Sequence, residues 1–287
     1  MNLDQAKGMF VGLAVGDALG TTLEFSRPSP DDVMHTEMTG GGPFGLPPGV
    51  WTDDTSLAVA MAASIINKYE FDPSDMMYEF INWQHNGMHS PMEKCFDIGS
   101  TTSTALSRGG DWFYPYQCTT EDNASGNGGI MRMAPIVILN HKSYEDALID
   151  SVRASMLTHG NQDCVRYAQA MAAVLFHGRL DDVYGEEMQI PQKFCDMTGN
   201  PYSGGYVAET YSAACHAVKT TSSFEDAIIQ AVNYRFDADT TGAVAGQIAG
   251  SIYGMNGIPK RWLDTLQWRD KIEDMAVQLW EMSPVKN

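Results

Sequence analysis

The sequence predicts an all-α protein, and three observations support that prediction. Apolar residues recur with the period of an α-helix over most of the 287-residue chain. Alternating runs long enough for a β-strand are missing, and a short apolar stretch such as residues 136–139 is too brief to indicate a sheet. No linker-like change in composition divides the sequence, so we expect residues 1–287 to form a single domain.

The predicted helices follow one another along the chain. The first covers residues 4–18, and the second covers residues 56–69, with Thr52, Asp53 and Asp54 at its start. Threonine and aspartate are typical of a helix N-terminus, where they cap free backbone N–H groups. Further helical patterns lie at residues 73–86, 129–139, 144–157, 162–177, 206–219, 224–233, 240–254 and 269–281.

Three stretches interrupt the helical pattern. Residues 27–50 hold five prolines among glycines, residues 109–128 mix glycine with aromatic residues, and residues 179–205 form a polar connection. Long loops inside a compact domain often carry function. Each stretch is therefore a candidate to line a site, with a plain surface loop as the alternative.

The charge balance excludes some classes of partner. The chain has 36 acidic and 18 basic side chains, a formal net charge of −18. Binding to duplex phosphates needs clustered Lys and Arg, so we expect no duplex nucleic acid as a partner. No apolar stretch is long enough to cross a membrane, Asp17 interrupts the apolar run near the start, and the five cysteines form no C-x-x-C pair. These features predict a soluble cytoplasmic protein with no membrane partner.

Two of the helices carry a glycine at every fourth position. A glycine inside a helix costs about 1 kcal/mol relative to alanine, so repeated glycines need a compensating role. Because positions i and i+4 share one face, each series leaves a strip without side chains. We expect these helices to cross each other, or a neighbour, at short range. The two series are Gly8, Gly12, Gly16 and Gly20, and Gly242, Gly246, Gly250 and Gly254.

Two acidic clusters flank the glycine-bearing helices. One aspartate suffices to cap a helix, so two in each cluster exceed what capping requires. If the clusters meet, their carboxylates need a cation to offset their repulsion. Oxygen ligands without Cys or a His pair favour two Mg²⁺ or Mn²⁺ ions over zinc. The alternative is that both clusters are caps and solvated loops. The clusters are Thr52, Asp53 and Asp54, and Asp237, Asp239 and Thr240.

Seven motifs together resemble a known family. In chain order they are GLAVGDALGTTLEF, WTDDTSLAVA, DIGSTT, GNGGIMRMAP, Thr158-His159, GGYVAETYSAA and DADTTGAVAGQIAG. This order is similar to that of ADP-ribosylglycohydrolases, and most of all to dinitrogenase reductase-activating glycohydrolase and its bacterial relatives. The resemblance implies a compact orthogonal multi-helix bundle with a binuclear Mg²⁺ or Mn²⁺ centre. It also implies hydrolysis of the glycosidic bond between ADP-ribose and a protein side chain or small acceptor, with arginine favoured.

The resemblance also implies roles for individual residues. Asp97 would be the general acid or base, and Glu24 would help position a water or a ribose hydroxyl. The implied metal ligands are Thr52, Asp53, Asp54, Asp237, Asp239 and Thr240. The implied substrate-binding residues are Gly99, Ser100 and Thr101 on a loop, Asn127, Gly128 and Gly129 with backbone N–H groups facing the diphosphate, and His159 and Tyr206. Trp112, Phe113 and Tyr114 are candidates to stack on adenine.

Several alternatives stay open. Asn127-Gly-Gly could be a turn, His159 a helix cap, Asp97 an Asx-turn and Tyr206 partly core. Arg235-Phe236 and Ser100 depart from the family pattern of small residues and asparagine at these positions, which leaves the substrate preference open. The whole chain could also be a non-catalytic ADP-ribose-binding or structural relative, or a different Mg²⁺-dependent hydrolase such as a phosphoesterase.

Overall fold

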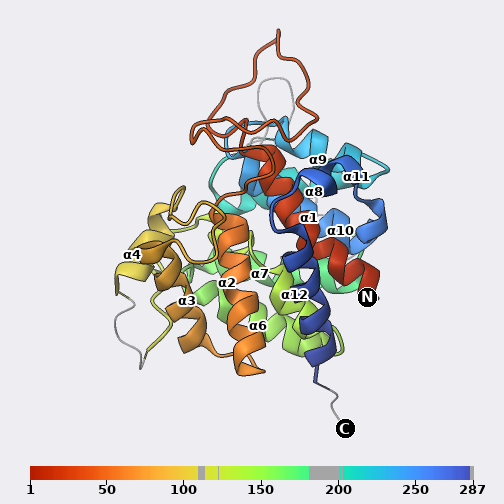
Figure 1. Cartoon of the computed structure of the whole chain (residues 1–287). Coiled ribbons are helices and arrows are strands. Elements are labelled where there is room, and N and C mark those ends of the chain that lie inside the picture. Colours follow the sequence, from red (N-terminus) through yellow and green to blue (C-terminus); the bar gives the residue numbers. More distant parts are fainter. Residues whose placement is uncertain (109–113, 122, 181–200, 202, 285–287) are drawn as a thin grey trace.

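The computed structural model describes residues 1–108, 114–121, 123–180, 201 and 203–284 (Figure 1). Within these residues, the regular structure consists of α-helices, two 3-10 helices and isolated β-bridges. The prediction of an all-α fold is therefore confirmed. A single cluster of buried side chains extends from Ala6 to Leu279, so helices from both ends of the chain share one core.

Most of the helices begin and end close to the predicted positions. The N-terminal half holds α1 (Leu3–Gly20), α2 (Asp53–Lys68), α3 (Pro73–Asn86), α4 (Ser100–Arg108), η1 (Asn127–Gly129) and α5 (Ala134–Leu139). The C-terminal half holds α6 (Tyr144–Met156), α7 (Gln162–His177), α8 (Val207–Lys219), α9 (Phe224–Val232), α10 (Ala238–Tyr253), η4 (Met255–Gly257), α11 (Lys260–Thr265) and α12 (Arg269–Met282).

Three elements differ from the sequence-based prediction. A continuous helix over 129–139 was wrong, because this stretch forms η1, a turn and then α5, with Pro135 in the first turn of α5. Proline is tolerated there because the first-turn N–H groups have no partner within the helix. Helices α4 and α11 were not predicted, and Ser100 and Thr101 lie in the first turn of α4 rather than on a loop.

The two glycine series face each other, as predicted. A Cβ atom added at Gly12 would lie 2.5 Å from the carbonyl oxygen of Gly246, and one added at Gly246 would meet the backbone of Gly12. Gly16 faces Gly242 in the same way, so α1 and α10 run antiparallel with their backbones in contact. This pairing brings the C-terminal end of α1 beside the N-terminal end of α10, where one acidic cluster begins.

The structure also shows whether a helix could span a membrane and whether the described cysteines are paired. No helix among the described residues has both the length and the apolar character that crossing a bilayer requires. Cys95, Cys118, Cys164 and Cys215 are free thiols, of which the last two are buried. Cys195 lies outside the described residues.

Candidate active site

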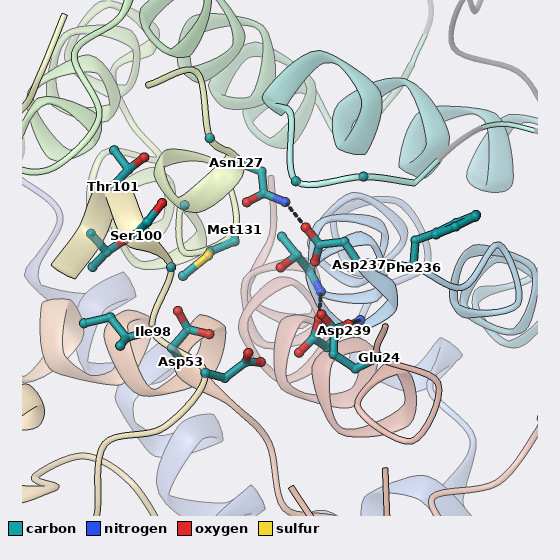
Figure 2. Close-up of a pocket in the computed structure, with 18 of the residues that line it drawn as sticks. Glu24, Asp53, Ile98, Ser100, Thr101, Asn127, Met131, Phe236, Asp237 and Asp239 are labelled. Carbon is teal, nitrogen blue, oxygen red and sulfur yellow. Dashed lines mark hydrogen bonds between the residues drawn. The ribbon is translucent and has the colours of Figure 1, made fainter. Parts of the chain in front are cut away.

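A cavity of about 600 Å³ opens where the ends of α1, α2, α4, η1 and α10 converge (Figure 2). Most of the residues proposed from the sequence line it. They are Glu24, Asp53, Asp97, Gly99, Ser100, Thr101, Asn127, Gly128, His159, Asp237, Asp239 and Thr240. Thr52 and Asp54 are buried just behind this wall, and Gly129 and Tyr206 are not among the lining residues.

The two acidic clusters meet at the base of this cavity. One group of carboxylate oxygens, within 4.8 Å of one another, comes from Glu24, Asp237 and Asp239, and a second comes from Asp17, Asp54 and Asp239. Asp239 belongs to both groups, so residues from α1, α2 and α10 form one continuous cluster. The expectation that residues about 180 positions apart would come together is confirmed.

Asp17 is a member of the cluster that the sequence analysis did not identify. Its carboxylate accepts hydrogen bonds from the backbone N–H groups of Thr52 and Thr55, at 2.9 and 3.0 Å. It also accepts from the two threonine hydroxyls, at 2.9 and 2.7 Å. Helix α2 therefore receives its N-terminal cap from α1 and not from its own N-cap side chain. An aspartate inside an otherwise apolar helix was the signal that could have revealed this role.

The carboxylates repel one another strongly. Burial, followed by the charge of neighbouring aspartates, raises the pKa of Asp53 and Asp54 well above the ordinary value. The same causes raise the pKa of Asp97 to about 11 and that of Asp237 to about 7. A group of carboxylates held this close favours either protons or a bound cation.

The donor set fits a hard divalent cation. The cluster offers carboxylate and threonine oxygens, and Asp54 Oδ1 is fully buried without a hydrogen-bond partner among the described residues. Burying a carboxylate oxygen without a partner is unfavourable in free energy unless a cation or a hydrogen-bond donor lies next to it. Oxygen ligands of this kind are those that Mg²⁺ and Mn²⁺ prefer.

Glu24 and Asn127 fix the position of helix α10. Glu24 Oε2 accepts the backbone N–H of Ala238 at 2.9 Å, which caps the start of α10. Asn127 Nδ2 donates to Asp237 Oδ2 at 2.7 Å (Figure 2). It also donates to Thr210 Oγ1 at 2.9 Å. The backbone N–H of Asn127 donates to Gly205, so it is not free to bind a diphosphate as the sequence analysis expected.

The two glycines beside Asn127 leave room for the side chains of His159 and Ser155. A Cβ added at Gly128 would lie 2.6 Å from His159 Cε1, and one added at Gly129 would collide with Ser155. The imidazole of His159 therefore lies against the backbone of η1 on one wall of the cavity. Tyr206 is placed differently, because its hydroxyl donates to Asp163 at 2.7 Å.

Two phenylalanines line the cavity on backbone that is unusual for bulky residues. Phe25 and Phe236 both have φ of 57°, and they are joined because the N–H of Phe25 donates to the carbonyl of Phe236 at 2.6 Å. Left-handed backbone at a bulky residue costs about 1–3 kcal/mol and tends to occur at functional sites. Sequence reasoning had singled out Arg235-Phe236 only as a departure from the family pattern.

Arg235 and Phe236 have different surroundings in the structure. Arg235 is not among the lining residues and pairs with Asp32 at 2.9 Å. Phe236 lines the cavity (Figure 2). Tyr114, the described member of the three candidates for adenine stacking, is not among the lining residues. Trp112 and Phe113 lie outside the described residues, and Tyr114 is exposed and pairs with Tyr116.

Fold and site together define a class of protein. It is an all-α protein with a carboxylate centre suited to divalent cations, at the base of a cavity large enough for a nucleotide-sized ligand. The chain belongs to the ADP-ribosylglycohydrolase family, whose model matches residues 2–287.

Several known proteins resemble the chain over nearly its whole length. An ADP-ribosylarginine hydrolase, Tri1, from Serratia proteamaculans is 39% identical, over 99% of this chain and 81% of the relative. An ADP-ribosyl-[dinitrogen reductase] glycohydrolase from Rhodospirillum rubrum is 32% identical, over 93% of this chain and 91% of the relative. A solved structure described as an ADP-ribosylglycohydrolase-related protein complex matches with a TM-score of 0.82 and 33% identity, over 98% of this chain and 99% of the other.

Proposed function

We propose that the protein is a metal-dependent hydrolase that cleaves the glycosidic bond between ADP-ribose and a modified arginine side chain. The observation that carries this proposal is the buried carboxylate cluster with Asp97 on the wall of the same cavity. The arginine acceptor is supported by the relatives named as ADP-ribosylarginine hydrolases in Serratia proteamaculans and Pseudomonas putida.

The proposed cofactor is a pair of Mg²⁺ or Mn²⁺ ions. The residues that would hold them are Thr52, Asp53, Asp54, Asp237, Asp239 and Thr240. When bound, the cations offset the carboxylate charge and act as Lewis acids toward ribose and water oxygens. Asp17 would act indirectly, because its four hydrogen bonds hold Thr52 and the start of α2 in place.

Asp97 is the proposed general acid or base. Burial, the largest cause, raises its pKa and favours a protonated carboxyl, and in the cation-free site the charges of Asp239 and Asp53 raise the pKa further. A protonated carboxyl can donate to the guanidine nitrogen as its bond to the anomeric carbon breaks, which an oxocarbenium-like transition state requires. Glu24 is less suited to this task, because one of its oxygens already caps α10.

The remaining lining residues would hold the substrate. Gly128 and His159 form the wall proposed for the diphosphate, and Ser100 and Thr101 at the start of α4 lie across the cavity from Asp239 (Figure 2). Asp97 lines the same cavity and lies close enough to Asp239 and Asp53 for their charges to raise its pKa. Holding the ribose between these walls would present the anomeric carbon to Asp97.

A substrate panel tests the proposed activity. Purified protein is assayed on ADP-ribosyl-arginine protein, ADP-ribosyl-serine protein, ADP-ribosylated nucleic-acid ends and O-acetyl-ADP-ribose, each with Mg²⁺, Mn²⁺ or EDTA. We expect release of ADP-ribose from the arginine conjugate, supported by one or both cations and abolished by EDTA. Release of phosphate instead would indicate a phosphoesterase, and preference for another conjugate would refute the arginine acceptor.

Two variants separate the proposed enzyme from a non-catalytic binder. Asp97→Asn should keep ADP-ribose binding by calorimetry but lose at least about 100-fold in kcat, the size of a general acid–base contribution. Asp239→Asn should lose cation binding as well as activity, since Asp239 belongs to both carboxylate groups. Asp270→Asn is the control, because its side chain is 89% exposed on α12. Full activity of either site variant contradicts the assignment, and ADP-ribose binding without turnover by the wild type supports the binder.

A further inference from the structure

Arg132 is a buried cation for which the proposed reaction provides no role. It lies between η1 and α5, is 1% exposed, and has no carboxylate in ion-pair contact among the described residues. Its guanidinium stacks on Phe80, 4.7 Å from the ring centroid, and its Nε and Nη1 find no hydrogen-bond partner in the described part of the chain. A fully buried arginine without an ion pair is unfavourable, so its single polar contact is informative.

That contact leads to His159 through Thr158. Arg132 Nη2 donates to Thr158 Oγ1 at 2.6 Å, and the same oxygen lies 2.7 Å from His159 Nδ1. A guanidinium can only donate hydrogen bonds, so Thr158 accepts from Arg132. The threonine hydroxyl then has one hydrogen of its own to place, and among the described residues Nδ1 is the acceptor within reach.

The alternative direction leaves a buried group unsatisfied. If His159 Nδ1 carried the hydrogen and donated it to Thr158, the threonine hydroxyl would lack an acceptor although Thr158 is fully buried. The arrangement in which the Thr158 hydroxyl both accepts and donates is Arg132 to Thr158 to Nδ1. Burial and the nearby charge of Arg132 lower the pKa of His159 to about 3, which keeps the imidazole neutral. A neutral ring with a bare Nδ1 carries its hydrogen on Nε2.

The Nε2 edge of the ring lies beside Gly126 and Gly128, in the part of the cavity proposed to hold the diphosphate. A Cβ atom added at Gly126 or Gly128 would lie 3.1 or 3.0 Å from Nε2, and all three residues line the cavity. The backbone of His159 is held as well, because its N–H donates to the Ser155 carbonyl at 2.7 Å and its carbonyl accepts from Ser155 Oγ at 3.0 Å. The ring therefore has a fixed place and a fixed side on which it can donate.

We infer that Arg132 is a positioning residue: through Thr158 it fixes the tautomer of His159, so that Nε2–H is a permanent donor to an anionic oxygen of the ligand. A neutral, pre-oriented donor binds a phosphate oxygen without depending on the protonation of histidine near neutral pH. The anionic ligand rests on the proposed function, whereas the tautomer is a property of the protein alone and can be tested without any ligand.

The first test is nitrogen-15 NMR of the imidazole rings in ligand-free protein at neutral pH. His159 is assigned by comparison with His159→Gln. We expect wild type to show only the Nε2-protonated form, Thr158→Val to show a mixture or the Nδ1-protonated form, and Thr158→Ser to restore the wild-type pattern. A charged or Nδ1-protonated His159 in wild type overturns the inference, and so does an unchanged tautomer in Thr158→Val.

The second test is binding of ADP-ribose and of adenosine, which lacks phosphates, by calorimetry. Thr158→Val should weaken ADP-ribose binding about 10- to 100-fold, the range for one hydrogen bond to a charged group, with no comparable change for adenosine. Thr158→Ser should bind as wild type. Thr21→Val is the matched control, since Thr21 is also buried and its hydroxyl has no partner among the described residues.

The two tests distinguish the inference from the proposed function. If wild type does not bind ADP-ribose, the proposed function fails, while the NMR spectra of wild type and the Thr158 and Arg132 variants still decide what sets the tautomer of His159. If Thr158→Val changes the tautomer but not ADP-ribose affinity, the contact to an anionic oxygen is refuted. Arg132→Met removes the donor to Thr158, so its effects on the His159 tautomer and on ADP-ribose affinity should match those of Thr158→Val if both act through His159. A wild-type tautomer in Arg132→Met overturns the role of Arg132.

Discussion

Asp17 decides the position of Thr52, one of the proposed metal ligands. Both of its oxygens are used, each accepting one backbone N–H and one hydroxyl from Thr52 or Thr55. A side chain with its acceptor capacity spent in this way orients its neighbours rather than holding an ion itself. The start of α2 is therefore tied to α1 by a single buried carboxylate.

Asp17→Asn should destabilise the protein and weaken cation binding. The amide replaces one acceptor oxygen by an N–H₂ donor, which then faces donors from Thr52 or Thr55. An unsatisfied buried polar group costs about 1–3 kcal/mol of unfolding free energy. Chemical denaturation with EDTA measures that cost, and Mg²⁺ or Mn²⁺ titration by calorimetry measures the second effect. Stability and cation affinity equal to those of the exposed control Asp270→Asn would contradict the role.

The site residues that could be identified from the sequence are those that belong to a recognisable motif. Asp53, Asp239 and Asp97 were identified because paired carboxylates and the family pattern point to them. Asp17 and Arg132 were not, because their roles depend on partners in space. Thr158, the partner of Arg132, is 26 positions away, and neither spacing nor periodicity indicates such a contact.

At the scale of elements, the pairing of α1 with α10 builds the site. The glycine strips set the register, with Gly8 at Gly250, Gly12 at Gly246 and Gly16 at Gly242. In that register the end of α1, carrying Glu24 just beyond it, reaches the first turn of α10. Close backbone packing thereby converts two distant sequence segments into one carboxylate cluster.

Gly12→Ala should destabilise the fold although alanine is the better helix former. The new Cβ would lie 2.5 Å from the Gly246 carbonyl oxygen and 3.0 Å from Phe224 Cε2, so α1 and α10 must separate. Overpacking of this kind costs about 1–3 kcal/mol, more than the about 1 kcal/mol gained in helix propensity. Urea unfolding measures the change.

Gly99→Ala is the control for that substitution. A Cβ at Gly99 would meet nothing within 4 Å, so the free energy of unfolding of Gly99→Ala should stay near that of wild type. If Gly12→Ala were as stable as Gly99→Ala, the close approach of the two backbones would not contribute to folding as argued.

Helices with a strong apolar period were predictable, and those without one were not. Residues 73–86 and 162–177 coincide with α3 and α7. Helix α4 has the sequence STTSTALSR, rich in residues that compete with the helix for backbone hydrogen bonds, and buries only Thr102, Ala105 and Leu106. Tertiary packing rather than local preference accounts for it, and for the six-residue α11.

At the scale of the whole molecule, only some of the 36 acidic side chains that give the net charge of −18 lie at the candidate active site. Seven carboxylates gather around the cavity. Burial lowers the pKa of the Arg132 guanidinium to about 10, and the charges of Asp53 and Asp54 act in the opposite direction. The seven are Asp17, Glu24, Asp53, Asp54, Asp97, Asp237 and Asp239. Composition alone predicted that the protein binds no duplex nucleic acid, but only the folded arrangement shows which of the acidic side chains lie together.

This concentration of charge predicts that a bound cation stabilises the protein more as the pH rises. Burial and the charge of Asp239 raise the pKa of both Asp17 and Asp237 from 3.8 to about 7. Between about pH 4 and 7 the EDTA-treated native state therefore holds more protons than the unfolded state, so its stability falls as pH rises. Mg²⁺ or Mn²⁺ binds the ionised native cluster and offsets this loss. Thermal unfolding at pH 5, 6 and 7 should show a growing difference in Tm between cation-loaded and EDTA-treated protein. The difference cancels the contribution of other ionisable groups, so a constant difference would refute cation binding at this cluster.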